Sequence, residues 1–152
     1  MTSKYLCKYL CKFWKNMIRT TLFLPKYDWV VYCYIAVDEY YTYEILDKMR
    51  TIGADNRVLA RAHRNLIAGS LNNGLTYSNP TMKKSVWVVA LTSSAKEFFN
   101  TIVHEIRHLQ QHIANEYDID HNSEEACYLC GDIACLLFPY CRELLCDHCR
   151  KG

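Results

Sequence analysis

The chain has 152 residues, of which 51% are hydrophobic and 22% are charged. A chain of this length and composition forms one globular domain with a sizeable core, which excludes an intrinsically disordered protein. The formal net charge of +2 is too small to indicate specific nucleic-acid binding. The nine cysteines are an odd number, so a completely disulfide-paired framework is excluded as well.

Basic residues are concentrated at the start of the chain. Five of them recur at helical spacing and predict one basic stripe on a helix: Lys4, Lys8, Lys12, Lys15 and Arg19. We therefore expect residues 1–27 to form a basic amphipathic helical segment, packed on or extending from a domain over residues 28–152. The stripe over residues 4–19 could contact an anionic membrane surface, but a solvated helix face is the preferred interpretation.

The same charges interrupt the apolar residues near the N-terminus, so this region does not resemble a secretion signal. No stretch of the sequence has the length and apolar character of a membrane span. We therefore expect a cytoplasmic protein. In that reducing compartment, cysteines serve as small buried residues, metal ligands or reactive thiols.

The middle of the chain alternates between strand and helix patterns. Residues 29–37 (WVVYCYIAV) form an apolar, β-branched and aromatic run that predicts a buried strand. Two amphipathic helices should follow, the first ending before Gly53 and the second before Gly69. A short segment over residues 75–78 then precedes a second predicted buried strand over residues 85–91 (SVWVVAL).

Two long helices should complete the chain. The capping-box sequence Ser94-Ala-Lys-Glu97 predicts a helix over about residues 95–115. A final helix should begin near Ser123 and end before Pro139. This order of elements predicts an α+β fold with a small sheet.

The strongest chemical signal is the pattern His104-Glu105-Ile106-Arg107-His108, in the middle of the helix over residues 95–115. This H-E-x-x-H spacing places two imidazoles one helical turn apart, where both can bind one Zn²⁺ ion. Glu105 falls beside them and is the candidate catalytic base. The helix can pack and still present the pair, because its apolar residues lie on another arc: Phe98, Ile102, Ile106, Leu109 and Ile113.

A catalytic zinc ion needs a third protein ligand and an open position for water. Ser123-Glu124-Glu125 begins the next predicted helix, and an antiparallel helix pair could bring this turn back toward the ion. Glu124 is the preferred third ligand and Glu125 is the alternative. Acidic residues in a first helical turn are also favoured by the helix dipole, so a role without metal stays open for both.

Residues 104–108 and 122–131 (NSEEACYLCG) together resemble the gluzincin branch of zinc metallopeptidases, in particular small peptidases of phage and mobile-element type. The resemblance covers roughly residues 75–137. It implies a small zincin-like domain in which His104, His108 and Glu124 hold zinc and Glu105 is the general base. It also implies that a zinc-activated water hydrolyses peptide bonds of a peptide or protein substrate.

The chain departs from the gluzincin pattern after the proposed ligand helix begins. Many members carry an aspartate four residues after the ligand glutamate, whereas this chain has Tyr128 or Leu129 there. A residue that orients a ligand histidine must then come from elsewhere, and the candidates are Asn100, Asp120 and Asp132. Candidate donors to the reacting carbonyl are Tyr77, Tyr128, His112 and His121. We expect His112 either to support the ligands from beside them or to be exposed, and not to bind the ion, because ligands at three successive turns diverge.

The predicted strand over residues 85–91 precedes the motif helix in the chain. If this strand lies at the edge of the sheet, an extended peptide substrate could pair with it by strand addition.

Cysteines near the C-terminus offer a second candidate metal site. Two C-x-x-C pairs have the spacing of a structural zinc site: Cys127 with Cys130, and Cys146 with Cys149. Against this interpretation, the first pair lies in a predicted helix, where cysteine is an ordinary core residue. A local metal site or a disulfide near the C-terminus is a further alternative.

These observations leave two classes of function. The preferred one is a zinc metallopeptidase. The alternative is a binding or regulatory module without proteolytic activity, stabilised by the cysteine site or derived from a degenerate zincin. Glu105 favours the peptidase, because a structural zinc site does not need a base.

Overall fold

The computed structural model describes residues 17–150, so most of the basic segment predicted at the N-terminus lies outside the described residues. In chain order, the elements are β1 (Ile18–Leu24), a 3-10 turn (Pro25–Tyr27), β2 (Trp29–Val37), a second 3-10 turn (Glu39–Tyr41), α2 (Thr42–Thr51), α3 (Asn56–Ile67), β3 (Gly74–Asn79), β4 (Lys84–Ala90), α4 (Ala95–Glu116), α5 (Glu124–Cys141) and α6 (Asp147–Arg150). The mixture of helices with one small sheet confirms the expected α+β class.

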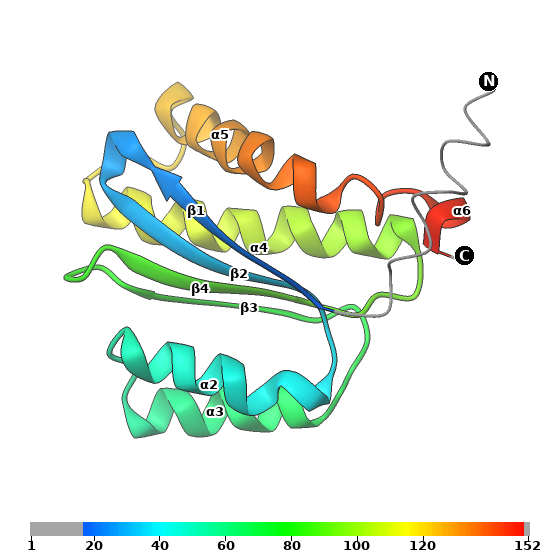
Figure 1. The fold of residues 1–152 in the computed structure, drawn as a ribbon. Coiled ribbons are helices and arrows are strands. Elements are labelled where there is room, and N and C mark those ends of the chain that lie inside the picture. Colours follow the sequence, from blue (N-terminus) through cyan, green and yellow to red (C-terminus); the bar gives the residue numbers. More distant parts are fainter. Residues whose placement is uncertain (1–16, 151–152) are drawn as a thin grey trace.

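The strands form a four-stranded sheet in the order β1-β2-β4-β3. β1 pairs with β2 and β3 pairs with β4 in antiparallel fashion, while β2 and β4 are parallel. Helices α2 and α3 connect these parallel strands by way of β3 and cover one face of the sheet. Helices α4 and α5 cover the other face, so the molecule has three layers (Figure 1).

The two strongly apolar runs form the two central strands. The predicted strand over residues 29–37 coincides with β2, and the one over 85–91 corresponds to β4. Both are bordered by strands on each side, as expected for continuous apolar runs that are buried on both faces. β4 is therefore not an edge strand, and the suggestion that it could add a peptide strand is wrong. β3 occupies that edge.

The helical expectation for the N-terminal segment is wrong for its last part. Residues 18–24 form strand β1, which pairs along its whole length with β2. Leu22 and Leu24 are buried while Phe23 between them is exposed, which is the alternation of a strand with one face on a core. Arg19, a member of the predicted basic stripe, instead binds Glu44 of α2 through both carboxylate oxygens.

The caps of the two long helices agree with the sequence prediction. Ser94 accepts a hydrogen bond from the backbone N–H of Glu97 at 3.1 Å, and Ser123 accepts one from Ala126 at 3.2 Å. α5 was expected to end before Pro139 but continues to Cys141. Pro139 lacks the N–H that would have bonded to the carbonyl of Cys135, but Leu137 and Cys141 on either side of it are buried in the larger core, and this packing holds the last turn in place.

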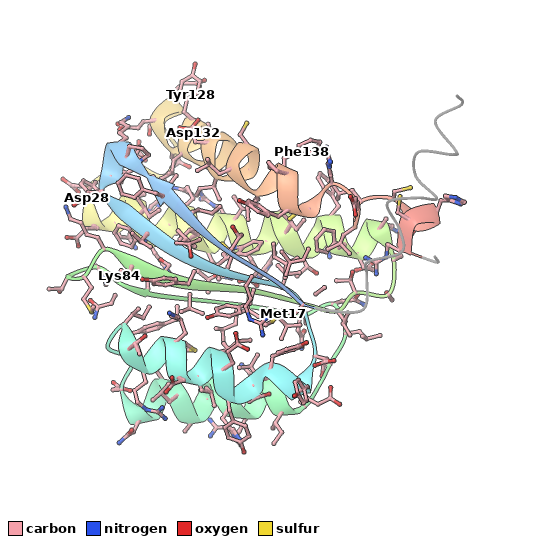
Figure 2. The ribbon with its side chains drawn as sticks, viewed as in Figure 1. Met17, Asp28, Lys84, Tyr128, Asp132 and Phe138 are labelled. Carbon is pink, nitrogen blue, oxygen red and sulfur yellow. The ribbon has the colours of Figure 1, made fainter. Side chains whose placement is uncertain are left out.

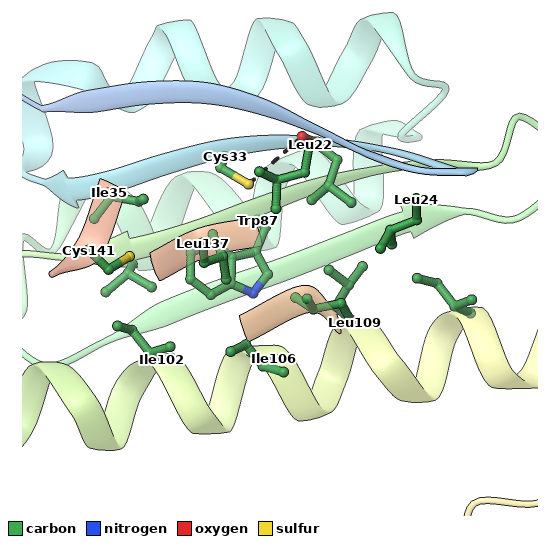
Figure 3. Close-up of a cluster of buried hydrophobic side chains, with 14 of the residues drawn as sticks. Leu22, Leu24, Cys33, Ile35, Trp87, Ile102, Ile106, Leu109, Leu137 and Cys141 are labelled. Atoms are coloured by element: carbon green, nitrogen blue, oxygen red, sulfur yellow. Dashed lines mark hydrogen bonds between the residues drawn. The ribbon is translucent and has the colours of Figure 1, made fainter. Parts of the chain in front are cut away.

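One hydrophobic core lies on each face of the sheet. The larger core joins β1, β2 and β4 to α4 and α5, and Figure 3 shows Trp87 of β4 close to Ile106 of α4 and Leu137 of α5. The smaller core joins Val86 and Val88 of β4 to α2 and α3. Within residues 17–150, no helix is long and apolar enough to cross a lipid bilayer.

Candidate metal centre

The centre lies on α4, where that helix runs along the edge strand β3. Three side chains of α4 bond to residues of this strand and of the turn before it: Thr101 to the carbonyl of Asn72, Glu105 to Thr76, and His112 to Ser78. At about 100° per residue, His108 and His104 point about 60° and 100° away from Glu105 around the helix axis. Ile102 and Ile106 lie in the opposite direction, toward the core. The histidine pair therefore faces away from α5, beside the outer edge of β3.

His104, Glu105 and His108 form a group that could hold a metal ion, because one ligand atom from each lies within 4.8 Å of the others. The two Nε2 atoms are 3.0 Å apart, and the ring planes cross at 76°. Two imidazoles bound to one tetrahedral Zn²⁺ at about 2.05 Å would have nitrogens about 3.3 Å apart. The observed separation is close to this value, so the donor atoms fit a shared ion with little adjustment.

Glu105 has a different environment from the two histidines. Only 4% of Glu105 is exposed, whereas the His104 side chain is 66% exposed. Its Oε2 accepts a hydrogen bond from the Thr76 hydroxyl at 2.7 Å, and its Oε1 lies 4.0 Å from the Nε2 of His104. This second distance exceeds that between two ligands of one zinc ion. The carboxylate thus lies next to the candidate metal position, within reach of a water molecule bound there.

A series of hydrogen bonds connects His112 to the interior of the sheet. Ser78 Oγ is 2.8 Å from His112 Nδ1 and 2.7 Å from Ser85 Oγ, which in turn accepts from the Trp29 indole at 2.8 Å. Burial lowers the pKa of His112, and the neighbouring His108 lowers it further. As expected from the sequence, His112 lies beside the candidate ligands and is not a member of their group.

Neither candidate glutamate of α5 joins this group among the described residues. Glu125 binds Lys26 at 2.8 Å, which places it against the turn between β1 and β2. Glu124 precedes it at the N-terminus of α5, and α5 packs on the side of α4 opposite to the histidine pair. The antiparallel arrangement of the two helices is present, but it does not direct the first turn of α5 toward the ion.

Most of the other candidate donors lie away from the pair. Tyr128 is 70% exposed and points outward from α5 (Figure 2). Asp132 of the same helix is also exposed. Tyr77 packs against the core on the opposite face of the sheet, where burial raises its pKa. His121 bonds to Asn115 at 2.8 Å in the connection between α4 and α5.

Asp120 and Asn100 are the two remaining residues that the sequence offered to orient a ligand histidine. Asp120 accepts a hydrogen bond from the backbone N–H of Asn122 and so stabilises the same connection. Asn100 is exposed one helical turn before His104 and shares its face of α4.

Among the described residues, the two cysteine pairs are not brought together as a metal-ligating group. Within residues 17–150, none of Cys127, Cys130, Cys146 and Cys149 belongs to a cluster of three or more metal-ligating side chains. Cys149 is disulfide-bonded, so its sulfur is not available as a thiolate ligand. Burial raises the pKa of Cys130, and the nearby Arg107 offsets this only in part. The disulfide of Cys149 opposes the four-thiolate interpretation, because zinc binds the thiolate form.

Three residues that shape the centre were not predicted from the sequence: Gly74, Thr76 and Ser78 of β3. They alternate along the strand, so all three face α4. The small and polar side chains at every second position were a usable signal. It could be interpreted only once β3 was known to lie against the motif helix.

Comparison of the chain with protein-family models, with curated proteins and with solved structures gives no match. The function of the chain is therefore inferred from the geometry of the centre.

Proposed function

We propose that the chain is a zinc-dependent peptidase in which His104 and His108 hold the metal ion and Glu105 is the general base. The observation that supports this proposal is the pairing of two exposed imidazoles, whose Nε2 atoms are 3.0 Å apart, with a buried carboxylate beside them. A zinc ion bound there would polarise a carbonyl group and lower the pKa of a bound water to about 7.

Each residue of the centre has its own role in this proposal. The two imidazoles bind the ion, and their exposure leaves room for water and substrate. The Oε1 of Glu105 faces the pair and accepts the proton of the attacking water, while its Oε2 is occupied by Thr76. A protonated Glu105 can then deliver that proton to the leaving amine. Glu124 has no part in this proposal, because α5 lies on the other side of α4. Within residues 17–150, Glu105 is the one side chain grouped with the two imidazoles, so a third protein ligand besides the proposed base is not found among the described residues.

The edge position of β3 favours an extended peptide as the substrate. Among the strands of residues 17–150, β3 pairs with β4 alone, so its other side has backbone groups that can bond to a further strand. That side adjoins the histidine-bearing face of α4. A peptide paired with β3 would thus pass beside the candidate metal position.

Metal analysis of the full chain tests the proposal. We expect the wild-type chain to bind zinc stoichiometrically and His104→Ala or His108→Ala to lose it. His63→Ala is the matched control, because His63 lies beside Tyr43, with the two rings 5.9 Å apart, on the α2 and α3 side of the sheet. Zinc retained by both His104→Ala and His108→Ala would contradict the proposed metal site.

Hydrolysis of labelled casein tests the role of Glu105. We expect Glu105→Gln to keep zinc, because neither imidazole is changed, and to lower kcat by at least about 100-fold. A zinc-loaded wild-type chain that cleaves neither casein nor a random peptide mixture would contradict the peptidase proposal and favour a binding module.

A further inference from the structure

The side of β3 that faces α4 is built from small or hydroxyl-bearing residues at alternate positions, namely Gly74, Thr76 and Ser78. An edge strand packed on a helix normally presents larger apolar residues to it. Here the contact is polar, and its centre is the Glu105 carboxylate.

Gly74 leaves the space that the Glu105 side chain occupies. A Cβ atom added at Gly74 would lie 2.4 Å from Cγ of Glu105 and 2.6 Å from both Cδ and Oε1. Contacts below 3 Å require a shift of one partner. Gly74 has no positive φ that would demand glycine for the backbone, so the close approach of Glu105 is the physical reason for glycine at this position.

Thr76 distinguishes the two oxygens of the same carboxylate. Its hydroxyl donates to Oε2 at 2.7 Å, while Oε1 lies toward His104. A carboxylate held through one oxygen cannot rotate freely, and a hydrogen bond to a charged acceptor is among the stronger ones in proteins. The other oxygen is thereby kept facing the candidate metal position.

We propose that Gly74 and Thr76 are positioning residues that hold the Glu105 carboxylate with Oε1 toward the histidine pair. Gly74 acts by the absence of a side chain, and Thr76 acts by its hydrogen bond. The catalytic consequence depends on the proposed function, since it assumes that Glu105 is the base. Such positioning is effective because a displacement of about 1 Å can cost about 100-fold in rate.

A double-mutant cycle in urea tests the steric part without any measurement of activity. We expect Gly74→Ala to lower the urea midpoint by about 0.5–1 M in the wild-type background and to have little effect in the Glu105→Ala background. Glu105→Ala removes all three atoms that the new methyl group would meet. Gly131→Ala is the matched control, because nothing lies within 4 Å of its added Cβ atom, and it should not lower the midpoint.

Equal midpoint shifts for Gly74→Ala in both backgrounds would overturn the steric assignment. If Gly74→Ala prevents folding, the same comparison applies: recovery of the folded state by Glu105→Ala supports the assignment, and failure to recover it overturns it.

Casein hydrolysis by zinc-loaded chains tests the role of Thr76. We expect Thr76→Val, which keeps the shape but removes the hydroxyl, to lower kcat by about 10-fold with zinc content and KM nearly unchanged. Thr76→Ser should restore most of kcat. A Thr76→Val chain with wild-type kcat would overturn the assignment of Thr76. If the wild-type chain is inactive but the urea cycle shows coupling, the peptidase proposal fails while the steric assignment of Gly74 stands.

Discussion

Ser85 lies at the centre of a buried hydrogen-bond series in the sheet. It is fully buried, it accepts from the Trp29 indole at 2.8 Å, and its hydroxyl is 2.7 Å from that of Ser78. Ser85→Ala leaves the Trp29 N–H without a partner in an apolar environment. We expect a loss of about 1–3 kcal/mol in the free energy of unfolding, measured by urea titration. Ser70→Ala, at an exposed turn position, should change it by less than about 0.5 kcal/mol.

Among individual residues, the members of the candidate site were predictable only where their positions depend on the geometry of a single helix. His104 and His108 share one helix, so their spacing alone places both imidazoles together. The proposed Glu124 ligand required knowledge of which side of α4 the next helix covers. That choice is made by Leu129, Ile133 and Leu137 of α5, which pack into the larger core and carry the first turn of α5 away from the pair.

An ion pair connects strand β1 to helix α2. Both Arg19 Nε and Nη2 of β1 bind the Glu44 carboxylate of α2, and the Nη2 bond is 2.6 Å long. The Arg19 bond holds the pKa of Glu44 below its usual value. A carboxyl group with a lowered pKa stabilises the folded state at pH values above its unfolded pKa of about 4.3. That contribution is lost as the pH falls through the lower pKa of the folded state.

We therefore expect Glu44→Gln to lower the free energy of unfolding by about 0.2–1 kcal/mol at pH 7, because both side chains are partly exposed. The difference from the wild-type chain should shrink once the pH falls below the unfolded pKa of about 4.3, and it should disappear only below the lower pKa of the folded state. Urea titrations at a series of pH values measure both quantities. Asp47→Asn, which removes the partner of Arg50 within α2, is the control for a local ion pair. A difference that persists unchanged in acid would contradict the assignment.

Helices and strands were predictable where one sequence pattern dominated. Their prediction failed where two sequence patterns competed. β2 is a nine-residue apolar run with no polar interruption and was predicted to the residue. β1 was missed because basic residues at helical spacing outweighed the alternation of its last residues, and pairing with β2 decides its conformation. The extent of α5 was missed because the packing of Leu137 and Cys141 in the larger core, which the local sequence does not reveal, opposes the cost of Pro139.

On the scale of the whole molecule, α4 contributes both to the larger core and to the candidate metal centre. Its apolar arc fills the larger core, and the adjacent arc carries Glu105 and His112 to β3. The histidine pair occupies the remaining exposed arc. The centre is thus built on a packed helix and a paired strand, which fixes its geometry more closely than a loop would. Destabilising the larger core should consequently disturb the centre as well.

The two cores share the same central strands, so the described domain should unfold as one unit. Ile133 of α5 and Ile45 of α2 are both fully buried on opposite faces of the sheet. We expect Ile133→Ala and Ile45→Ala each to lower the free energy of unfolding by about 2–5 kcal/mol. Their effects should add to within about 0.5 kcal/mol in the double variant, because the two sites have no shared contact.

Two optical signals in the same urea titration measure this cooperativity. Trp29 and Trp87 both lie in the larger core, and the third tryptophan, Trp14, lies outside the described residues. In a Trp14→Phe background, tryptophan fluorescence therefore reports on that face, whereas far-ultraviolet circular dichroism reports on all helices. We expect the two midpoints to coincide, also in Ile45→Ala, where the mutation is on the opposite face. If Ile45→Ala lowers the midpoint of the dichroism but leaves that of the fluorescence unchanged, then α2 and α3 unfold independently of the layer that carries the candidate metal centre.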